Sequence, residues 1–247
     1  MIQPPRRTIL SCAALCLAAA SGCATGQGAF PGLTSLAPQP RADVLWEATF
    51  DDLDPEEWRN VEVRGRSAYA IVQLDGRSCL EAQSRGSGSI LLRPTRYDPD
   101  VFETLSWRWR VDRPVDKEDL RRKDGSDAPA RVYVYFDTPG LPGQKRSLDY
   151  VWSLTLPPGT AMNSPYSSAS KIIVVDGGRQ AVGQWHTVVR NIEEDYERHF
   201  GGNVPYVVAV GVMTDSDNTR GESLAFVDDL RVMRRGGASG PSETPAR

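Results

Sequence analysis

Much of the chain consists of short stretches in which apolar and polar residues alternate, separated by turns rich in glycine, proline and aspartate. Alternation with a period of two places successive side chains on opposite faces of a β-strand. The regular spacing of the stretches favours an all-β sandwich. The pattern predicts strands over residues 45–50, 68–74, 89–92, 105–111, 131–137, 148–154, 171–175, 185–190, 206–213 and 224–232.

One short helix is predicted to follow Asn191. The Asn191 side chain can cap a helix N-terminus, and Glu194 completes a capping box three residues later. Tyr196 and Phe200 then share one helix face, and Gly201 is suited to ending the helix.

The N-terminus carries two arginines (6–7), an apolar run (9–20) and small residues directly before Cys23. This order predicts a lipoprotein signal peptide over residues 1–22, with Cys23 as the acylated first residue of the mature chain. The apolar run is too short to span a bilayer, which needs about 20 residues. Simple secretion is the alternative, and a twin-arginine export route ranks behind ordinary secretion.

The rest of the chain divides by composition. Residues 23–41 are mostly small and lack periodicity, which predicts a flexible tether. Residues 42–233 hold the alternating stretches and predict one β-sandwich domain, and residues 234–247 predict a disordered tail. The sequence therefore predicts a cell-envelope lipoprotein on the extracytoplasmic side, in the periplasm or at the outer membrane.

The net charge limits the classes of partner, and the cysteine content limits the disulfides that the chain can form. Loss of the two signal-peptide arginines leaves 27 basic and 32 acidic residues, a net charge of about −5 by formal counting. That balance argues against nucleic acid as a partner. Apart from Cys23, the mature chain keeps only Cys79, so it forms no intramolecular disulfide, and Cys79 is expected to be a buried, inert thiol.

Several segments in the same order resemble the bacterial family known as domain of unknown function 3047, over about residues 44–233. The resemblance implies no activity or catalytic residue. At a looser level, residues 183–188 and 225–232 resemble strands of carbohydrate-binding modules, which implies an antiparallel jelly-roll sandwich. The segments that resemble the family are 50–52, 107–111, 124–137 (DGSDAPARVYVYFD), 150–152, 183–185 and 211–219.

Two predicted strands carry a distinctive set of polar residues. Alternation places Trp107 and Trp109 on one face of strand 105–111, and core aromatics are commoner than exposed sugar platforms. The opposite face would then join that of strand 131–137 in one broad groove, provided that the two strands are neighbours. Either this face binds a ligand or it is a solvated ladder of ion pairs. The groove would contain Arg108, Arg110, Arg131, Tyr133 and Tyr135.

The segment 215–219 is dense in oxygen ligands. It departs from a helix-loop-helix calcium site, because Arg220 stands where glycine is required and Phe226 where glutamate is required. A polar turn is the simpler interpretation. A structural calcium ion near the terminal strands is the one cofactor that the sequence suggests, with Glu47, Asp51 and Asp228 as its ligands. Plain cross-strand and turn carboxylates are the simpler interpretation of these three residues.

No motif in the sequence indicates catalysis, and a carbohydrate-active enzyme stays an alternative. A glycosidase needs two carboxyl groups about 5–10 Å apart, which sequence spacing does not define. No serine lies in a nucleophile elbow, and the two histidines lack metal-ligand spacing. The candidate acids are Asp137, Asp149, Asp215 and Asp217.

The sequence thus favours a noncatalytic, membrane-tethered domain that binds a saccharide or an anionic envelope component. A carbohydrate-active hydrolase or lyase and a structural subunit of an envelope assembly are the alternatives. The candidate ligand-binding residues are Arg108, Arg110, Arg131, Tyr133, Tyr135, Asp137, Asp215, Asp217 and Asn218.

Overall fold

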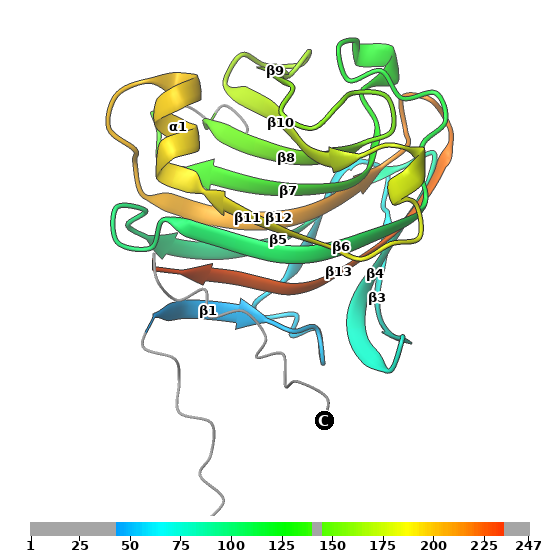
Figure 1. The fold of residues 1–247 in the computed structure, drawn as a ribbon, viewed down its shortest axis with the longest axis horizontal. Coiled ribbons are helices and arrows are strands. Elements are labelled where there is room, and N and C mark those ends of the chain that lie inside the picture. The colour runs from blue at the N-terminus through cyan, green and yellow to red at the C-terminus, as the bar shows by residue number, and fades with distance from the viewer. Residues whose placement is uncertain (1–42, 140–144, 235–247) are drawn as a thin grey trace, which may run out of the picture. The chain divides into compact units, whose positions relative to one another are not determined.

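A computed structural model describes residues 43–139 and 145–234 (Figure 1). The predicted signal peptide, acylated Cys23, tether and C-terminal tail from residue 235 lie outside the described residues. Among the described residues, no helix is long and apolar enough to cross a membrane.

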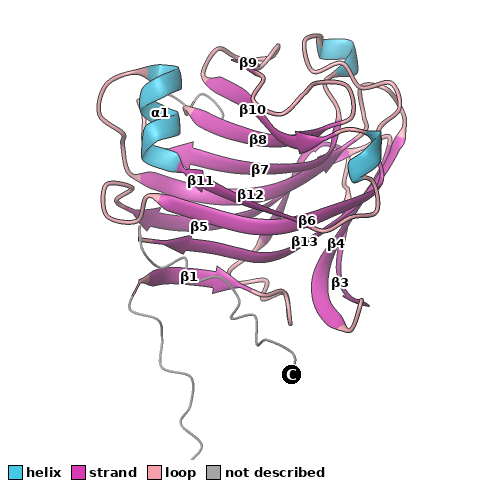
Figure 2. Ribbon diagram, in the orientation of Figure 1, coloured by secondary structure: helices cyan, strands magenta, loops and turns pink. Residues whose placement is uncertain are grey.

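Two β-sheets form the domain, which confirms the predicted all-β sandwich (Figure 2). Sheet A runs in the order β11-β6-β13-β4-β3, and β1 also pairs with β13. Every pair in this sheet is antiparallel. Its strands are β1 (Val44–Ala48), β3 (Ala68–Leu74), β4 (Arg77–Arg85), β6 (Thr104–Arg113), β11 (His186–Asn191) and β13 (Glu222–Met233).

Sheet B runs in the order β2-β5-β12-β7-β8-β10-β9. It is antiparallel except for the parallel pair β8 and β10, because the connection between these two strands contains β9 and returns to the same end of the sheet. Its strands are β2 (Arg59–Arg64), β5 (Gly88–Tyr97), β7 (Ala128–Phe136), β8 (Ser147–Ser153), β9 (Ala161–Asn163), β10 (Ser170–Gly177) and β12 (Val207–Asp215).

The core lies between the sheets. Trp107 and Trp109 of β6 are fully buried with their rings in edge contact, 5.3 Å between centroids. Val132 and Val134 of β7 enter the same core from the other sheet. This confirms that the tryptophan face points inward.

The expectation that β6 and β7 are neighbours is wrong. β6 pairs with β11 and β13 in sheet A, whereas β7 pairs with β12 and β8 in sheet B. Consecutive strands are adjacent only about two-thirds of the time. Here the long connection after β6 includes the short 3₁₀ helix η1 (Lys123–Gly125) and carries the chain from one sheet to the other.

That connection is packed against the domain at several points. Leu120 is fully buried in a second apolar cluster with Val151 of β8 and Val174 of β10. The side chain of Glu118 accepts a hydrogen bond from the Leu154 backbone N–H at 3.0 Å. The connection therefore covers part of the outer side of sheet B.

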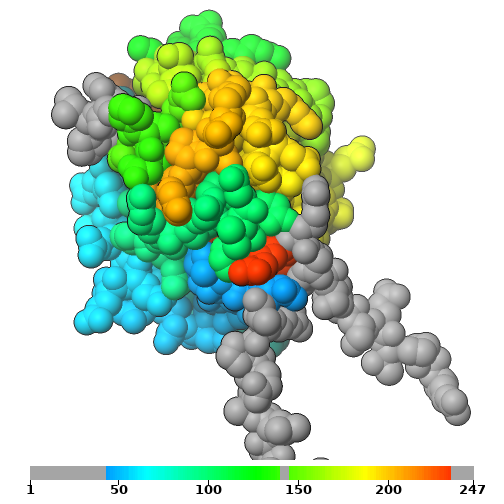
Figure 3. Space-filling model, turned by 90° about the vertical axis from the view of Figure 1, so that its left-hand side faces the viewer, coloured from blue at the N-terminus to red at the C-terminus, as the bar shows by residue number. Residues whose placement is uncertain are grey.

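The helix α1 (Ile192–Phe200) forms where the capping pattern predicts it. The Asn191 side chain accepts a hydrogen bond from the Glu194 backbone N–H at 3.0 Å. Gly201 ends the helix with φ of +71°, a conformation that glycine adopts without strain. Buried Tyr196 packs on Phe136 of β7, and α1 covers this end of the sandwich (Figure 3). A second 3₁₀ helix, η2 (Arg179–Ala181), precedes β11.

Candidate functional site

The predicted groove residues divide between the two sheets. Arg108 and Arg110 lie on the outer face of sheet A, because their neighbours Trp107 and Trp109 point into the core. Tyr133 lies on the outer face of sheet B for the same reason, together with Arg131 and Tyr135. The five side chains therefore do not line one groove, since the sandwich core separates the two sets.

On sheet A the arginines form ion pairs within the chain. Arg108 lies 3.6 Å from the Asp229 carboxylate and stacks over the Trp185 ring, 4.7 Å from its centroid. Arg110 bonds both oxygens of Asp112, at 2.6 and 3.1 Å. Such surface pairs contribute about 0–1 kcal/mol each. The outer face of sheet A therefore carries a ladder of ion pairs, as the second interpretation of these arginines predicts.

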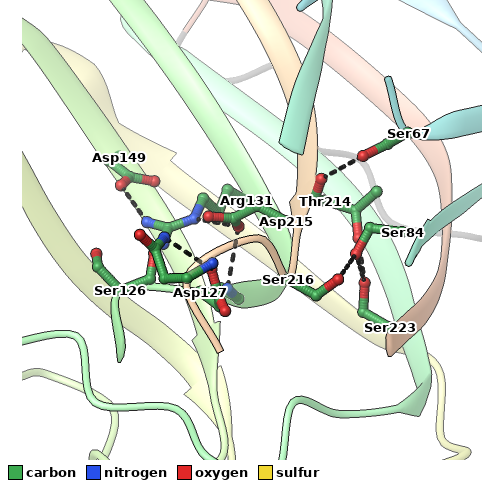
Figure 4. A network of polar contacts seen from close by, with 12 residues as sticks. Ser67, Ser84, Ser126, Asp127, Arg131, Asp149, Thr214, Asp215, Ser216 and Ser223 are labelled. Carbon is green, nitrogen blue, oxygen red and sulfur yellow. Dashed lines mark hydrogen bonds and ion pairs between the residues drawn. The ribbon is translucent and has the colours of Figure 1, made fainter. Parts of the chain in front are cut away.

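Arg131 lies at the centre of a buried polar network on sheet B (Figure 4). Its side chain is 3% exposed and lies between two carboxylates. Nη1 donates to Asp149 at 2.7 Å, and Nε donates to Asp215 at 3.0 Å. Nη2 donates to the Ser126 carbonyl at 3.0 Å. Arg131 therefore holds β7, β8, β12 and the preceding connection together.

One cation between two buried carboxylates leaves an excess of negative charge. Burial raises the pKa of Asp149, opposed by the nearby Arg131 charge and the Tyr133 hydroxyl. Burial raises the pKa of Asp215 to about 7, and Asp127 adds to the effect while Arg131 opposes it. Burial also raises the pKa of Asp217. The Asp215 carboxyl of this network therefore gains or loses its proton near neutral pH.

Asp127, Asp215 and Asp217 bring carboxylate oxygens within 4.8 Å of one another, the single such group of metal-ligating side chains in residues 43–139 and 145–234. Asp127 accepts hydrogen bonds from the backbone N–H groups of Asn218 and Thr219. The predicted oxygen-dense segment thus meets an acid from the β6–β7 connection, which sequence reasoning missed. Oxygen ligands of this kind suit hard divalent cations.

The structure does not bring the expected calcium ligands together. Glu47 accepts from Arg231 at 2.5 Å, and Asp51 accepts from the Thr49 hydroxyl at 2.7 Å. Asp228 lies 3.2 Å from Arg77. Each of the three carboxylates therefore has a separate neighbour within the chain.

Asp137 also lies apart from the other candidate acids. It follows β7 at the far end from Arg131 and pairs with Arg96 at 2.7 Å and Lys145 at 3.1 Å. The hydrogen bonds from these two cations lower the pKa of the Asp137 carboxyl. Asp137 therefore does not form an acid pair with Asp149 or Asp215.

Two partly exposed tyrosines, Tyr133 and Tyr135, lie next to each other on the outer face of sheet B. The rings of Tyr133 and Tyr135 are stacked, with centroids 5.5 Å apart and planes 11° apart. Burial, together with the Asp149 charge, raises the pKa of both hydroxyls, so both stay protonated. Each hydroxyl therefore keeps its proton, and that of Tyr133 lies beside the Asp149 carboxylate.

The surface beside the tyrosines is apolar. Gly211 of β12 lies directly opposite Tyr133 on one side and Leu92 of β5 on the other. A Cβ at Gly211 would lie 2.7 Å from Ile90 Cγ2 and 3.2 Å from Leu92 Cδ1, so these two side chains lean over the glycine. We call Tyr133, Tyr135, Gly211, Ile90 and Leu92 the tyrosine face.

Buried hydroxyl groups lie between the sheets near the Arg131 network (Figure 4). The Ser223 hydroxyl lies 2.6 Å from those of both Ser84 and Thr214. Ser84 donates to Ser216 at 2.8 Å, and Ser67 donates to the Thr214 carbonyl at 3.0 Å. These bonds fix the end of β12 that carries Asp215. Scattered serines give no sequence signal for such a network.

Three of the cavities in the described part of the chain have volumes of about 480, 380 and 240 Å³. None of the three is lined by Asp149, Asp215 or Asp217. The largest lies at the edges of β2 and β3, away from the predicted residues.

Fold and site together define a β-sandwich domain with an aromatic outer face and a buried ionic network beneath it. The chain belongs to a family described as protein of unknown function (DUF3047), whose model matches residues 56–231. No curated protein matches the chain.

Several solved structures are distantly similar. One is the family 30 carbohydrate-binding module of the cellulosomal cellulase Cel9D-Cel44B of Clostridium thermocellum, with 9% identity and a TM-score of 0.44 over 78% of this chain and 99% of that chain. Another is TmCBM27, described as recognising mannan, with 13% identity and a TM-score of 0.35 over 78% and 97%. A third is the xyloglucanase domain of NopAA from Sinorhizobium fredii in complex with cellobiose, with 8% identity and a TM-score of 0.42 over 76% and 99%. These ligands and activities belong to those proteins.

Proposed function

We propose that this chain is a noncatalytic saccharide-binding protein, held at the outer side of a bacterial membrane by a lipid on Cys23, and that the tyrosine face is its binding surface. The observation that carries the proposal is the pair of stacked, partly exposed tyrosines on a rigid sheet. The anchor rests on the signal-peptide pattern before Cys23.

A sugar ring has an apolar C–H face and a rim of hydroxyl groups. Tyrosine offers an apolar ring for the first and a polar hydroxyl for the second. Tyr133 lies opposite Asp149 across the β7–β8 pair, with Arg131 beside it on β7. Because this network fixes the strand that carries both tyrosines, little conformational entropy is lost when a ligand binds.

The charge beneath the tyrosine face favours a neutral ligand. Asp149 and Asp215 flank Arg131, the one buried cation in the described part of the chain, and Asp127 lies close by. An anionic ligand would meet this excess of acidic groups without a free arginine to pair with. The saccharide alternative is therefore preferred to the anionic envelope component.

A hydrolase is the second candidate, because the neighbouring acids Asp215 and Asp217 both have raised pKa values. Against it, Asp215 Oδ1 already accepts from the Ala128 backbone N–H and from Arg131. Neither acid lines any of the three cavities. The noncatalytic function is preferred on this ground, and release of reducing ends from a bound polysaccharide would reverse that preference.

Removal of the tyrosine rings should abolish most of the binding. A glycan array identifies the saccharide that the purified chain binds, and calorimetry then measures its affinity. Tyr133→Ala and Tyr135→Ala are each expected to weaken that affinity about tenfold or more, the scale of an aromatic anchor in an interface. Unfolding midpoints should change far less than affinity, because both rings lie outside the core.

Trp185→Ala is the matched control, because Trp185 is a partly exposed aromatic on the outer face of the opposite sheet. It should leave the affinity unchanged. If Trp185→Ala weakens binding and the tyrosine variants do not, the binding surface is on sheet A. A chain that binds nothing on the array contradicts the proposal as a whole.

Replacing the lipidated cysteine should release the domain from the membrane. Cys23→Ala removes the thiol that would carry the lipid, so the variant should appear in the soluble extracytoplasmic fraction while the natural chain stays with membranes. Fractionation with metabolic fatty-acid labelling measures both effects. A processed Cys23→Ala variant that stays membrane-bound without label would overturn the anchor.

A further inference from the structure

The smallest of the three cavities lies between two neighbouring loops of the sandwich (Figure 1). It holds about 240 Å³ and is bounded by the start of the β6–β7 connection and by the turn between β12 and β13. Charged side chains make up much of its lining, with three cations and two acids. They are Arg113, Lys117, Arg220, Asp116 and Glu222.

We propose that this loop cavity binds the phosphate group of an anionic ligand, with Lys117 and Arg220 as its contacts. The cavity shares no residue with the tyrosine face, so the proposal stands whether or not that face binds a saccharide. Three features carry the inference: two cations without a counter-charge, walls that are fixed by hydrogen bonds and packing, and an arginine in a backbone conformation that favours glycine.

Two of the three cations have no counter-charge within the described chain. Arg113 donates to Glu222 at 2.6 Å, and Arg85 lies directly opposite Glu222 in the β4–β13 pair, so the charge of this acid is already balanced. Lys117 and Arg220 are exposed, and neither forms an ion pair with any described residue. A phosphate group carries about −1.5 to −2 charges at pH 7 and three acceptor oxygens, so it can pair with both cations at once.

The backbone of Arg220 has a conformation that arginine rarely adopts. Its φ is +55°, in the left-handed region where glycine, asparagine and aspartate are the usual residues. The turn is fixed, because Ser216 Oγ donates to the Gly221 carbonyl at 3.0 Å and the Gly221 N–H donates to the Ser216 carbonyl at 3.1 Å. Backbone strain of this kind is typical of ligand-binding loops, and no partner of Arg220 in the described chain accounts for it.

The opposite wall is anchored in the interior of the domain. Val115 is buried, and a Cβ at Gly221 would lie 3.7 Å from its Cγ1 methyl group, so the two loops pack against each other. The Glu118 backbone N–H donates to the Val115 carbonyl at 3.2 Å, which closes a turn that contains Lys117. Because both backbones are fixed, only the long cationic side chains lose conformational freedom when an anion binds.

Titration of the purified chain with glycerol 3-phosphate tests the proposal, followed through the amide chemical shifts of ¹⁵N-labelled protein at constant ionic strength. Saturable shifts are expected at the Lys117 and Gly221 amides. Glycerol, the uncharged probe, should cause none. Glucuronate offers a single negative charge on two carboxylate oxygens, so it should bind more weakly than glycerol 3-phosphate.

Arg220→Gly removes one cation and places glycine at the positive φ, which glycine adopts without strain. The affinity for glycerol 3-phosphate should therefore fall about tenfold or more, while the unfolding midpoint stays unchanged. Lys117→Gln should reduce the affinity by a similar factor. Asp116→Asn removes a like charge from the cavity wall and should raise the affinity. The matched control is Arg179→Gln, at an exposed arginine of η2 outside the cavity, which should change nothing.

Absence of saturable shifts with glycerol 3-phosphate, or unchanged affinity in either folded variant that lacks a cation, overturns the loop cavity as a phosphate site. Glucuronate binding at the same amides with equal or higher affinity means that the cavity takes a carboxylate, and the phosphate assignment is then wrong. If Arg220→Gly lowers the unfolding midpoint, Lys117→Gln decides the result. Tyr133→Ala should leave the titration unchanged, because Tyr133 does not line the cavity.

Discussion

Arg131→Ala is expected to destabilise the domain by about 3–5 kcal/mol near pH 7.5, the cost of removing one partner from a buried ion pair. The change leaves Asp149 and Asp215 buried without the cation that bonds both of them. It also removes the hydrogen bond to the Ser126 carbonyl. Urea unfolding followed by tryptophan fluorescence measures the loss.

Arg110→Ala is the matched control on the other sheet. Arg110 is partly exposed and pairs with Asp112, so its loss should cost about 0–1 kcal/mol. Lowering the pH should also reduce the penalty of Arg131→Ala, because protonation of Asp149 and Asp215 removes their buried charges. If Arg131→Ala keeps full stability and abolishes saccharide binding, Arg131 is a ligand contact and the network assignment is wrong.

The sequence predicts which face of a strand is buried better than it predicts the strand's neighbours. Alternation correctly assigns Trp107 and Trp109 to the core, and local capping chemistry correctly places α1 after Asn191. Both are short-range properties. Which strands lie beside β6 and β7 depends instead on where the long connection between them leads. The period of the hydrophobic pattern carries no information about that.

The alternating pattern did not predict strands β2 and β4, for a related reason. β2 has alternating valines, but its burial is low because it is an edge strand. β4 reads Arg-Ser-Cys-Leu-Glu-Ala-Gln-Ser-Arg, and its inward positions include Ala82 and Ser84. Small and hydroxyl side chains face the interior there, so hydrophobic periodicity is weak although the strand is central.

The candidate site was predictable only in part. Arg108 and Arg131 have equivalent places in the alternating pattern, yet one lies on a surface ladder and the other is buried between carboxylates. Asp149 on the next strand and Asp215 on β12, 84 residues away, decide the role of Arg131, and Asp127 adds to the negative charge around Asp215. Such long-range partners are set by sheet order, which a single sequence does not reveal.

Asp215→Asn is expected to stabilise the domain at alkaline pH and to have little effect near pH 4. Burial raises the folded-state pKa of Asp215 from 3.8 to about 7. A carboxyl with a raised folded-state pKa contributes stability below its unfolded pKa and loses that contribution as pH rises through the folded value. The free energy of unfolding of the natural chain should therefore fall between about pH 4 and pH 8, by at most about 4 kcal/mol from this group.

Asparagine should remove this pH dependence without disturbing the geometry. Its side-chain oxygen can still accept from the Ala128 backbone N–H and from Arg131, while Asp149 keeps the ion pair with Arg131. Urea midpoints at pH 5 and pH 8, measured in EDTA to exclude bound divalent cations, give the difference between the two chains. Asp52→Asn, at an exposed position, is the control. A difference that is equal at both pH values, or that favours the natural chain at pH 8, means that Asp215 is ionised in the folded domain throughout, with Arg131 fully compensating its burial.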